Sequence, residues 1–166
     1  MVQQDSQDPE EEIQEEEVIE PDDDQSDDEN AIEIREWMEN FEGVKKEEIQ
    51  QTITDLLAAL EKDKKAHPKR RRYMLKIADN KIPFVFRTGS FDDTISFGLM
   101  VDKLKSAGKV STQAAMFIQK HVIFPRLSTD EIRQGSHRVH DGDSVKLFQN
   151  ILQASGVNDE YEIKNL

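Results

Sequence analysis

The chain has 166 residues, enough for one domain of ordinary size with tails. It contains no cysteine, which excludes disulfide bonds and cysteine-ligated zinc. No apolar run is long enough to span a bilayer, and the N-terminus is acidic where a signal peptide would be basic, so we expect a cytoplasmic protein that does not enter a membrane.

The net charge of −13 is concentrated at the N-terminus. Residues 1–30 contain 15 Asp or Glu and no Lys or Arg, whereas the rest of the chain is nearly balanced. Such a segment cannot bury enough apolar surface to offset its ordering entropy, so we expect a disordered tail. It would serve as a solubilising spacer, as a segment that attracts a basic partner electrostatically, or as a segment that competes with other ligands for the chain's own basic segment.

Residues 31–66 predict a helical hairpin with Gly43 at its turn. Its second helix runs from about Lys45 to Lys65 and carries one apolar stripe at helical spacing. The stripe would either dock on the core or contact a partner, and we expect a partner. The candidate partner-binding residues are Ile49, Ile53, Leu56, Leu57 and Leu60.

A basic segment follows from Lys62 to Arg72, with seven Lys or Arg in eleven residues. It would be either a patch that contacts phosphate groups or a solvated linker between a helix and a strand. The linker is favoured because no aromatic residue is interleaved for base stacking. The candidate phosphate contacts are Lys64, Lys65, Lys69, Arg70, Arg71 and Arg72.

Two runs of alternating apolar residues between Arg72 and Thr88 predict a β-hairpin, and Pro83 indicates an edge strand. The next helix begins at Ser90 or Asp92 and should end at Gly108. Gly98 inside this helix suggests close packing or a break. Its expected buried residues are Ile95, Leu99, Val101 and Leu104.

The stretch from Ser111 to Leu127 is apolar on nearly every face and predicts a buried central helix that ends at Pro125. We expect Phe117 in the core and His121 at a polar position beside the buried face of this helix (a polar shoulder). A new helix start follows at Ser128-Thr129-Asp130-Glu131. The last helix should be capped by Asp143 and bury an apolar face that includes Val145, Leu147 and Ile151.

One loop holds the only cluster of side chains with metal-ligand chemistry, which consists of His137, His140, Asp141 and Asp143. Their spacing matches no metal motif, and an N-cap role explains Asp143, so we assign no metal site. No nucleophile elbow and no glycine-rich phosphate loop is present. We therefore expect no catalytic residues, no cofactor and no enzymatic activity.

These patterns predict a mostly α (α+β) fold, a small helical domain with one β-hairpin. The expected divisions are a disordered acidic tail at 1–30, a helical hairpin at 31–66, a β-hairpin plus helical domain at 67–157, and a flexible C-terminal tail at 158–166.

The second half of the chain contains four short features in a fixed order: the aromatic strand and helix start IPFVFRTGSFDD, the step VIFPRLSTDEI, a loop with Gly-Asp, and the last helix SVKLFQNILQASGV. In this order and spacing, residues 81–157 resemble the bacteriophage tail assembly chaperone family. The acidic tail, the helical hairpin and the basic linker depart from the pattern of that family.

The resemblance implies a small, mostly helical and non-enzymatic protein of the host cytoplasm. It implies binding to the tape measure protein and a role in assembling tail tube subunits. The alternative, from the charge pattern, is a phage or nuclear regulatory protein whose acidic tail masks a nucleic-acid-binding segment at Lys62–Arg72.

Overall fold

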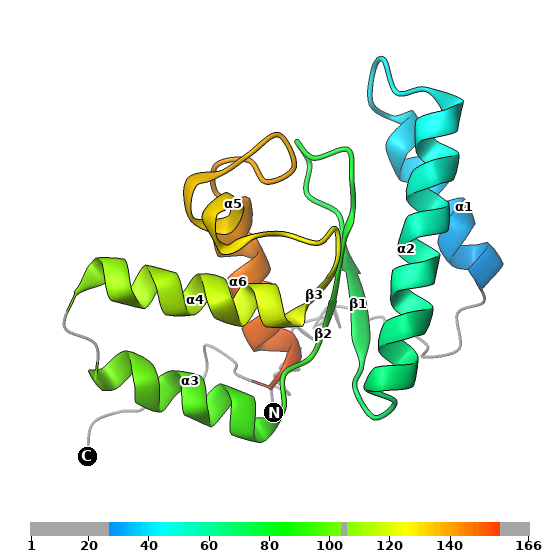
Figure 1. Cartoon of the computed structure of the whole chain (residues 1–166). Helices are drawn as coiled ribbons and strands as arrows, with labels where there is room; N and C mark the ends of the chain where they lie inside the picture. Colours follow the sequence, from blue (N-terminus) through cyan, green and yellow to red (C-terminus); the bar gives the residue numbers. More distant parts are fainter. Residues whose placement is uncertain (1–26, 104–105, 157–166) are drawn as a thin grey trace, which may run out of the picture.

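A computed structural model describes residues 27–103 and 106–156 of the chain (Figure 1). The described part is mostly helical and has one small antiparallel sheet, which confirms the predicted fold class. In chain order, the elements are α1 (Asp27–Glu39), α2 (Lys46–Ala66), β1 (Arg72–Leu75), β2 (Phe84–Arg87), α3 (Phe91–Lys103), α4 (Ala107–His121), β3 (Val122–Phe124), α5 (Thr129–Gln134) and α6 (Asp143–Ala154).

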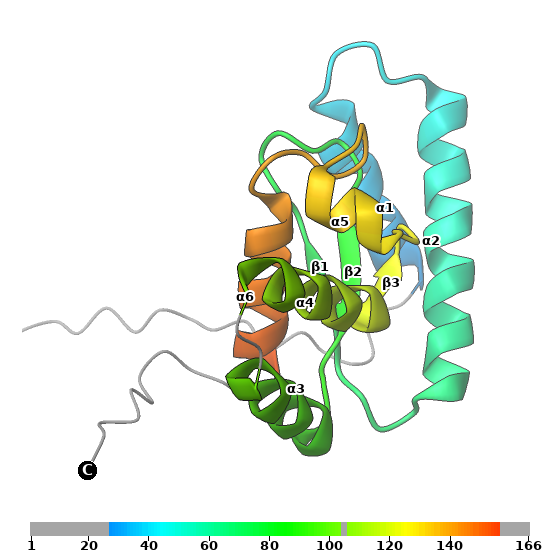
Figure 2. The ribbon, with the colours of Figure 1, turned by 60° about the vertical axis from the view of Figure 1, so that its left-hand side comes forward.

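The sheet has the order β1-β2-β3 and lies between two helical layers. The hairpin of α1 and α2 covers one face, and α4, α5 and α6 lie on the other (Figures 1 and 2). Successive side chains of a strand point to opposite faces. Phe84 and Phe86 accordingly join the core beneath α4 and α6, while Val85 joins the core beneath α2. Each strand therefore contributes to both cores.

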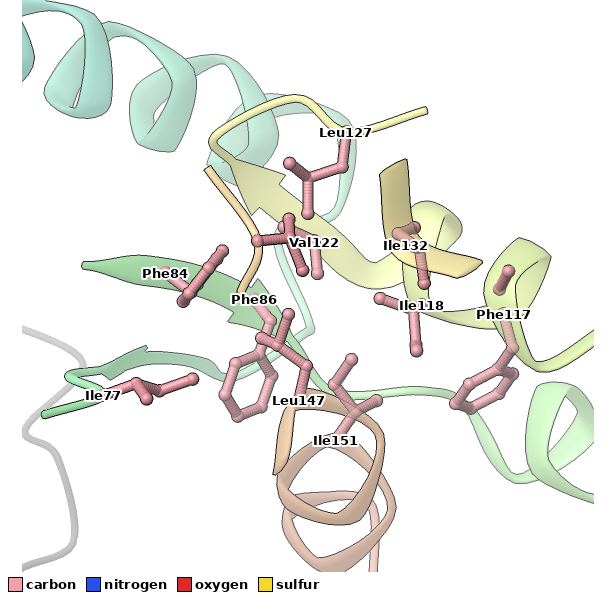
Figure 3. Packing of buried hydrophobic residues seen from close by; sticks show 12 residues of the cluster. Ile77, Phe84, Phe86, Phe117, Ile118, Val122, Leu127, Ile132, Leu147 and Ile151 are labelled. Atoms are coloured by element: carbon pink, nitrogen blue, oxygen red, sulfur yellow. The ribbon is translucent and has the colours of Figure 1, made fainter. Parts of the chain in front are cut away.

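The core beneath α4 and α6 is built around the two phenylalanines of β2 (Figure 3). Phe117 of α4 is 7% exposed and lies in this core, which confirms the predicted place of its side chain. Leu147 and Ile151 from α6 are completely buried there. Val145, which we expected inside, is 59% exposed on α6.

The second core joins the helical hairpin to the sheet. Ile34 and Met38 of α1 and Leu56 of α2 are completely buried in it, together with Val85 and Ile123. The hairpin thus shares the sheet with the rest of the fold. Residues 27–30, assigned to the tail, form the first turn of α1, while residues 1–26 and 158–166 lie outside the described part.

Asn80 is 2% exposed and links three segments that lie far apart in the sequence. Its backbone carbonyl accepts a hydrogen bond from Trp37 Nε1 at 3.1 Å, and its side-chain nitrogen donates to the Arg138 carbonyl at 2.8 Å. Lys76 adds an ion pair to Glu33 at 2.5 Å. These contacts fix the turn between β1 and β2 against both α1 and the loop before α6.

The predicted central helix is displaced toward the N-terminus. α4 begins at Ala107 with Ser106 as its N-cap and ends at His121, so Gly108 lies in its first turn rather than ending the helix before it. Val122, Ile123 and Phe124 form β3 and pair with β2. β-Branched and aromatic residues suit a strand, and this strand provides side chains to both cores.

The β-hairpin is present as predicted, with Tyr73 opposite Phe86. The edge position indicated by Pro83 is wrong, because β2 is the central strand. Pro83 is buried directly before β2, where its missing N–H removes no ladder hydrogen bond. Within the described residues, no helix combines the length and the apolar character that crossing a membrane requires.

Candidate protein-binding site

The proposed partner stripe on α2 is buried. Ile49, Ile53, Leu56 and Leu60 are at most 8% exposed and pack in the second core, and Leu57 is half-buried against it. A contact surface needs exposed side chains, so the placement of the partner site on this stripe is corrected. The stripe instead joins the hairpin to the sheet.

Arg72, a candidate phosphate contact, is held inside the protein. Its Nε donates to Asp63 Oδ2 at 2.8 Å, and its other nitrogens donate to the carbonyls of Asp63, His67 and Arg70. Asp63 Oδ1 accepts from Arg87 Nη1 at 2.6 Å. This buried ion cluster occupies the guanidinium group of Arg72, which corrects its assignment as a phosphate contact.

The other candidate phosphate contacts lie at the end of α2 and in the loop that follows. Lys65 is exposed and pairs with Glu61 at 2.9 Å, while Lys69 and Arg71 are exposed without an ion pair to any described residue. Lys64 and Arg70 are half-buried. Nucleic-acid binding by this segment stays a prediction, with fewer available cations than the sequence suggested.

The loop before α6 does not bring metal ligands together. Asp143 is 2% exposed, and its Oδ2 accepts from the His140 backbone N–H at 2.9 Å. His137, His140 and Asp141 are exposed. No group of three or more His, Cys, Asp or Glu suited to a metal occurs among the described residues. Asp143 is the first residue of α6 and Gly142 is the N-cap, which corrects the predicted cap.

Helix α3 presents an apolar face to solvent. Phe91, Ile95 and Leu99 recur every fourth residue, so they share one face of the helix. They are 79%, 46% and 58% exposed. We call these three residues the α3 stripe. The prediction that Ile95 and Leu99 lie inside is therefore wrong, and the side chains of Val101 and Leu104 lie outside the described part.

One aromatic side chain anchors α3 to the core. The Phe97 ring lies 4.9 Å from Phe117 and 5.4 Å from Phe148, measured between ring centroids. Gly98 is not explained by packing, because an added Cβ would meet nothing within 4 Å. A helix with a mid-helix glycine and few buried apolar contacts has low local stability. α3 therefore combines an apolar surface with a weak attachment.

A pocket of about 660 Å³ lies between α2, α3 and α4. Its apolar lining includes Phe97, Phe117, Val122 and Ile123, together with Met100 and Met116. The two methionines are 42% and 50% exposed. Methionine side chains adapt their shape to different ligands and are common at binding surfaces. The pocket and the α3 stripe lie on different faces of α3, because none of the stripe residues lines the pocket.

Two of the cations that line the pocket have no ion pair among the residues that the structure describes. Among its charged residues, Arg87 pairs with Asp63 at 2.6 Å and Lys120 pairs with Asp93 at 2.5 Å. Lys62 and Arg126 are exposed and form no ion pair with a described residue. The pocket therefore offers an apolar floor and two positive charges to a ligand.

His121 is 1% exposed and not the polar shoulder we expected. Its Nδ1 donates to the Phe117 carbonyl at 2.7 Å, and its Nε2 lies 3.7 Å from Asp93 Oδ2. Burial, together with the charges of Arg87 and Lys120, lowers the pKa of His121 below its usual 6.5, despite the opposing effects of the Phe117 carbonyl and Asp93. The ring therefore links the last turn of α4 to the first turn of α3.

Asp93 connects this histidine to the start of α3. Burial acts against its charge, but hydrogen bonds from Lys120 and from Ser90 lower the pKa of Asp93 far below its usual value. Ser90 and Asp93 also form a reciprocal cap, with Asp93 N–H donating to Ser90 Oγ at 2.9 Å. The sequence left the start of this helix open between Ser90 and Asp92 and did not predict the pairing with α4, because nothing local relates residues 93 and 120.

Comparison with known proteins finds no matching family model, no related curated protein and no similar solved structure.

Proposed function

We propose that this protein is a non-enzymatic adaptor that covers an apolar segment of a partner protein during assembly. The observation that carries the proposal is the α3 stripe, three large apolar side chains on one face of a weakly attached helix. Burying a side chain of this kind contributes roughly 1.5–3 kcal/mol to association. Monomeric proteins rarely expose such a face without a partner for it.

The resemblance of residues 81–157 to bacteriophage tail assembly chaperones suggests which partner this is. Such a chaperone would bind the tape measure protein and promote the assembly of tail tube subunits, in the cytoplasm of the bacterial host. α3 lies within the resembling part of the chain. An amphipathic partner helix would contact the stripe through apolar residues at matching spacing.

Co-purification with the tape measure protein of the same tail tests the proposal. Replacing Ile95 and Leu99 by Asp should abolish co-purification, because both side chains are exposed and the charges would face the partner. The matched control replaces Ile32 and Val145 by Asp, which are 51% and 59% exposed on other helices. Circular dichroism should show that both double variants are folded.

Two results would count against this function. The first is equal co-purification of the stripe variant and the control. The second is that the wild-type protein does not bind tail proteins but binds DNA, with an affinity that falls steeply with rising salt concentration, as phosphate contacts require. That result would favour the regulatory alternative and the exposed cations Lys65, Lys69 and Arg71.

A further inference from the structure

The pocket between α2, α3 and α4 has features that the α3 stripe lacks. Part of its lining is apolar, and the two lining charges that form no ion pair with a described residue, Lys62 and Arg126, are both positive. Water solvates both exposed cations, but each still attracts an acidic group nearby, and the attraction is stronger where apolar side chains exclude water. The matching ligand is therefore a segment that combines carboxylates with aliphatic side chains.

Residues 10–20 of this chain, EEEIQEEEVIE, have this composition. The segment contains seven glutamates and no basic residue, interrupted by Ile13, Val18 and Ile19. Uniformly acidic tails keep a protein soluble without aliphatic residues, so the three aliphatic side chains need a separate explanation. They would contact the pocket floor while the glutamates face Lys62 and Arg126.

The path of the chain permits this contact. The described part begins at Asp27, the start of α1, and Figure 1 shows this end of α1 beside the C-terminal half of α2. Ala59, Lys62 and Ala66 of that half line the pocket. Six residues separate Glu20 from Asp27, and the seven Cα–Cα steps across them span up to roughly 25 Å when extended. That length is close to the diameter of a small domain, so the segment can reach the pocket from α1.

We propose that residues 10–20 bind in the pocket between α2, α3 and α4 of the same chain, with their aliphatic side chains on its floor and their glutamates against Lys62 and Arg126. The inference goes beyond the proposed function and does not depend on it, because the α3 stripe lies on another face of the helix. Attraction between exposed charges is screened by salt, so the segment should leave the pocket as the ionic strength rises.

Paramagnetic relaxation in the full-length chain tests the proposal. Because the natural sequence has no cysteine, a Gln14→Cys variant carries a nitroxide at one position only. Methionine methyl signals report its location, since Met100 and Met116 line the pocket while Met38 and Met74 belong to the second core. We expect the Met100 and Met116 signals to be lost, with those of Met38 and Met74 retained.

A charge-reversal pair supplies the control. Adding Lys62→Glu and Arg126→Glu should restore the Met100 and Met116 signals, whereas Lys45→Glu with Lys46→Glu, an equal charge change at the far end of α2, should not. The fluorescence of Trp37, the only tryptophan, verifies that each variant is folded.

The proposal fails if the Met100 and Met116 signals persist in the labelled chain. It also fails if these signals are still lost after the charges of Lys62 and Arg126 are reversed. It also fails if the loss appears on an unlabelled chain mixed with a labelled one, since the contact is then between molecules. None of these readouts involves a partner protein. Failure here and failure of co-purification through the α3 stripe are therefore separate results.

Discussion

Replacing Asp63 by Asn tests whether the buried ion cluster holds the fold together. Asp63 is 8% exposed, and its side chain joins Arg72 on β1 to Arg87 on β2. The two arginines lie directly opposite each other across the strands, where like charges are destabilising. The carboxylate neutralises this repulsion and links both strands to the end of α2. Asn keeps the size of the side chain and removes its charge.

The expected loss follows from the exposure of the arginines. Their side chains are 10% and 15% exposed, so water cannot replace the lost carboxylate effectively. Removing one partner of a buried ion pair destabilises a protein by about 3–5 kcal/mol. With an m-value of about 2 kcal/mol/M, the midpoint of urea unfolding should fall by roughly 2 M. Trp37 fluorescence follows the transition, because Trp37 donates a hydrogen bond to Asn80 and so reports the docking of α1.

Two comparisons make this measurement decisive. Glu61→Gln removes an exposed ion pair with Lys65 on the same helix and should leave the midpoint nearly unchanged. Adding Arg72→Met and Arg87→Met to Asp63→Asn should recover much of the lost stability, because no buried charge is then left unpaired. A fall of less than about 0.5 M for Asp63→Asn would show that the arginines are solvated and that the structural role of Arg72 is wrong.

Two further predictions concern α3 and His121. Gly98→Ala should stabilise the protein by about 0.5–1 kcal/mol in urea unfolding, since the added Cβ meets nothing within 4 Å; a loss of stability would show that Gly98 is needed for packing. His121 has a lowered pKa in the folded state, so below its usual pKa of 6.5 the unfolded chain binds a proton that the folded protein resists. Stability should therefore fall as the pH drops from 7.0 through 6.5, and His121→Gln should flatten this part of the profile. The lowered pKa values of Asp93 and Glu131, the latter to about 2, contribute stability that is lost only below pH 4.5, outside this range.

Local signals in the sequence predicted the elements whose structure depends on neighbouring residues. The start signal at Ser128 is a capping box in the structure, with Glu131 N–H donating to Ser128 Oγ and the Glu131 side chain accepting from Ser128 N–H. The alternation around Tyr73 and Phe86 predicted the β-hairpin. Both depend on contacts within a few residues or on a single turn, which periodicity and cap chemistry describe directly.

The errors occurred where distant contacts decide the structure. Val122, Ile123 and Phe124 continue the apolar run of α4 without a break, so no local signal ends the helix before Pro125. Pairing with β2 turns these residues into a strand. His121 appeared to be a surface residue, but it is buried because Asp93, far away in the sequence, covers its ring together with Phe117.

The sheet explains why the two amphipathic helices were assigned the wrong way round. A strand in the middle of a sheet has apolar residues on both sides, so Val85 and Ile123 require a cover opposite the one that packs on Phe84 and Phe86. The stripe of α2 supplies that cover, and the hairpin cannot then offer it to a partner. α2 covers one face of β2, and α4 and α6 cover the other, so the sheet leaves no open face for α3. Only Phe97 among the described side chains of α3 joins a core. Phe91, Ile95 and Leu99 are left without an internal surface to cover, which is why we place the partner contact on α3.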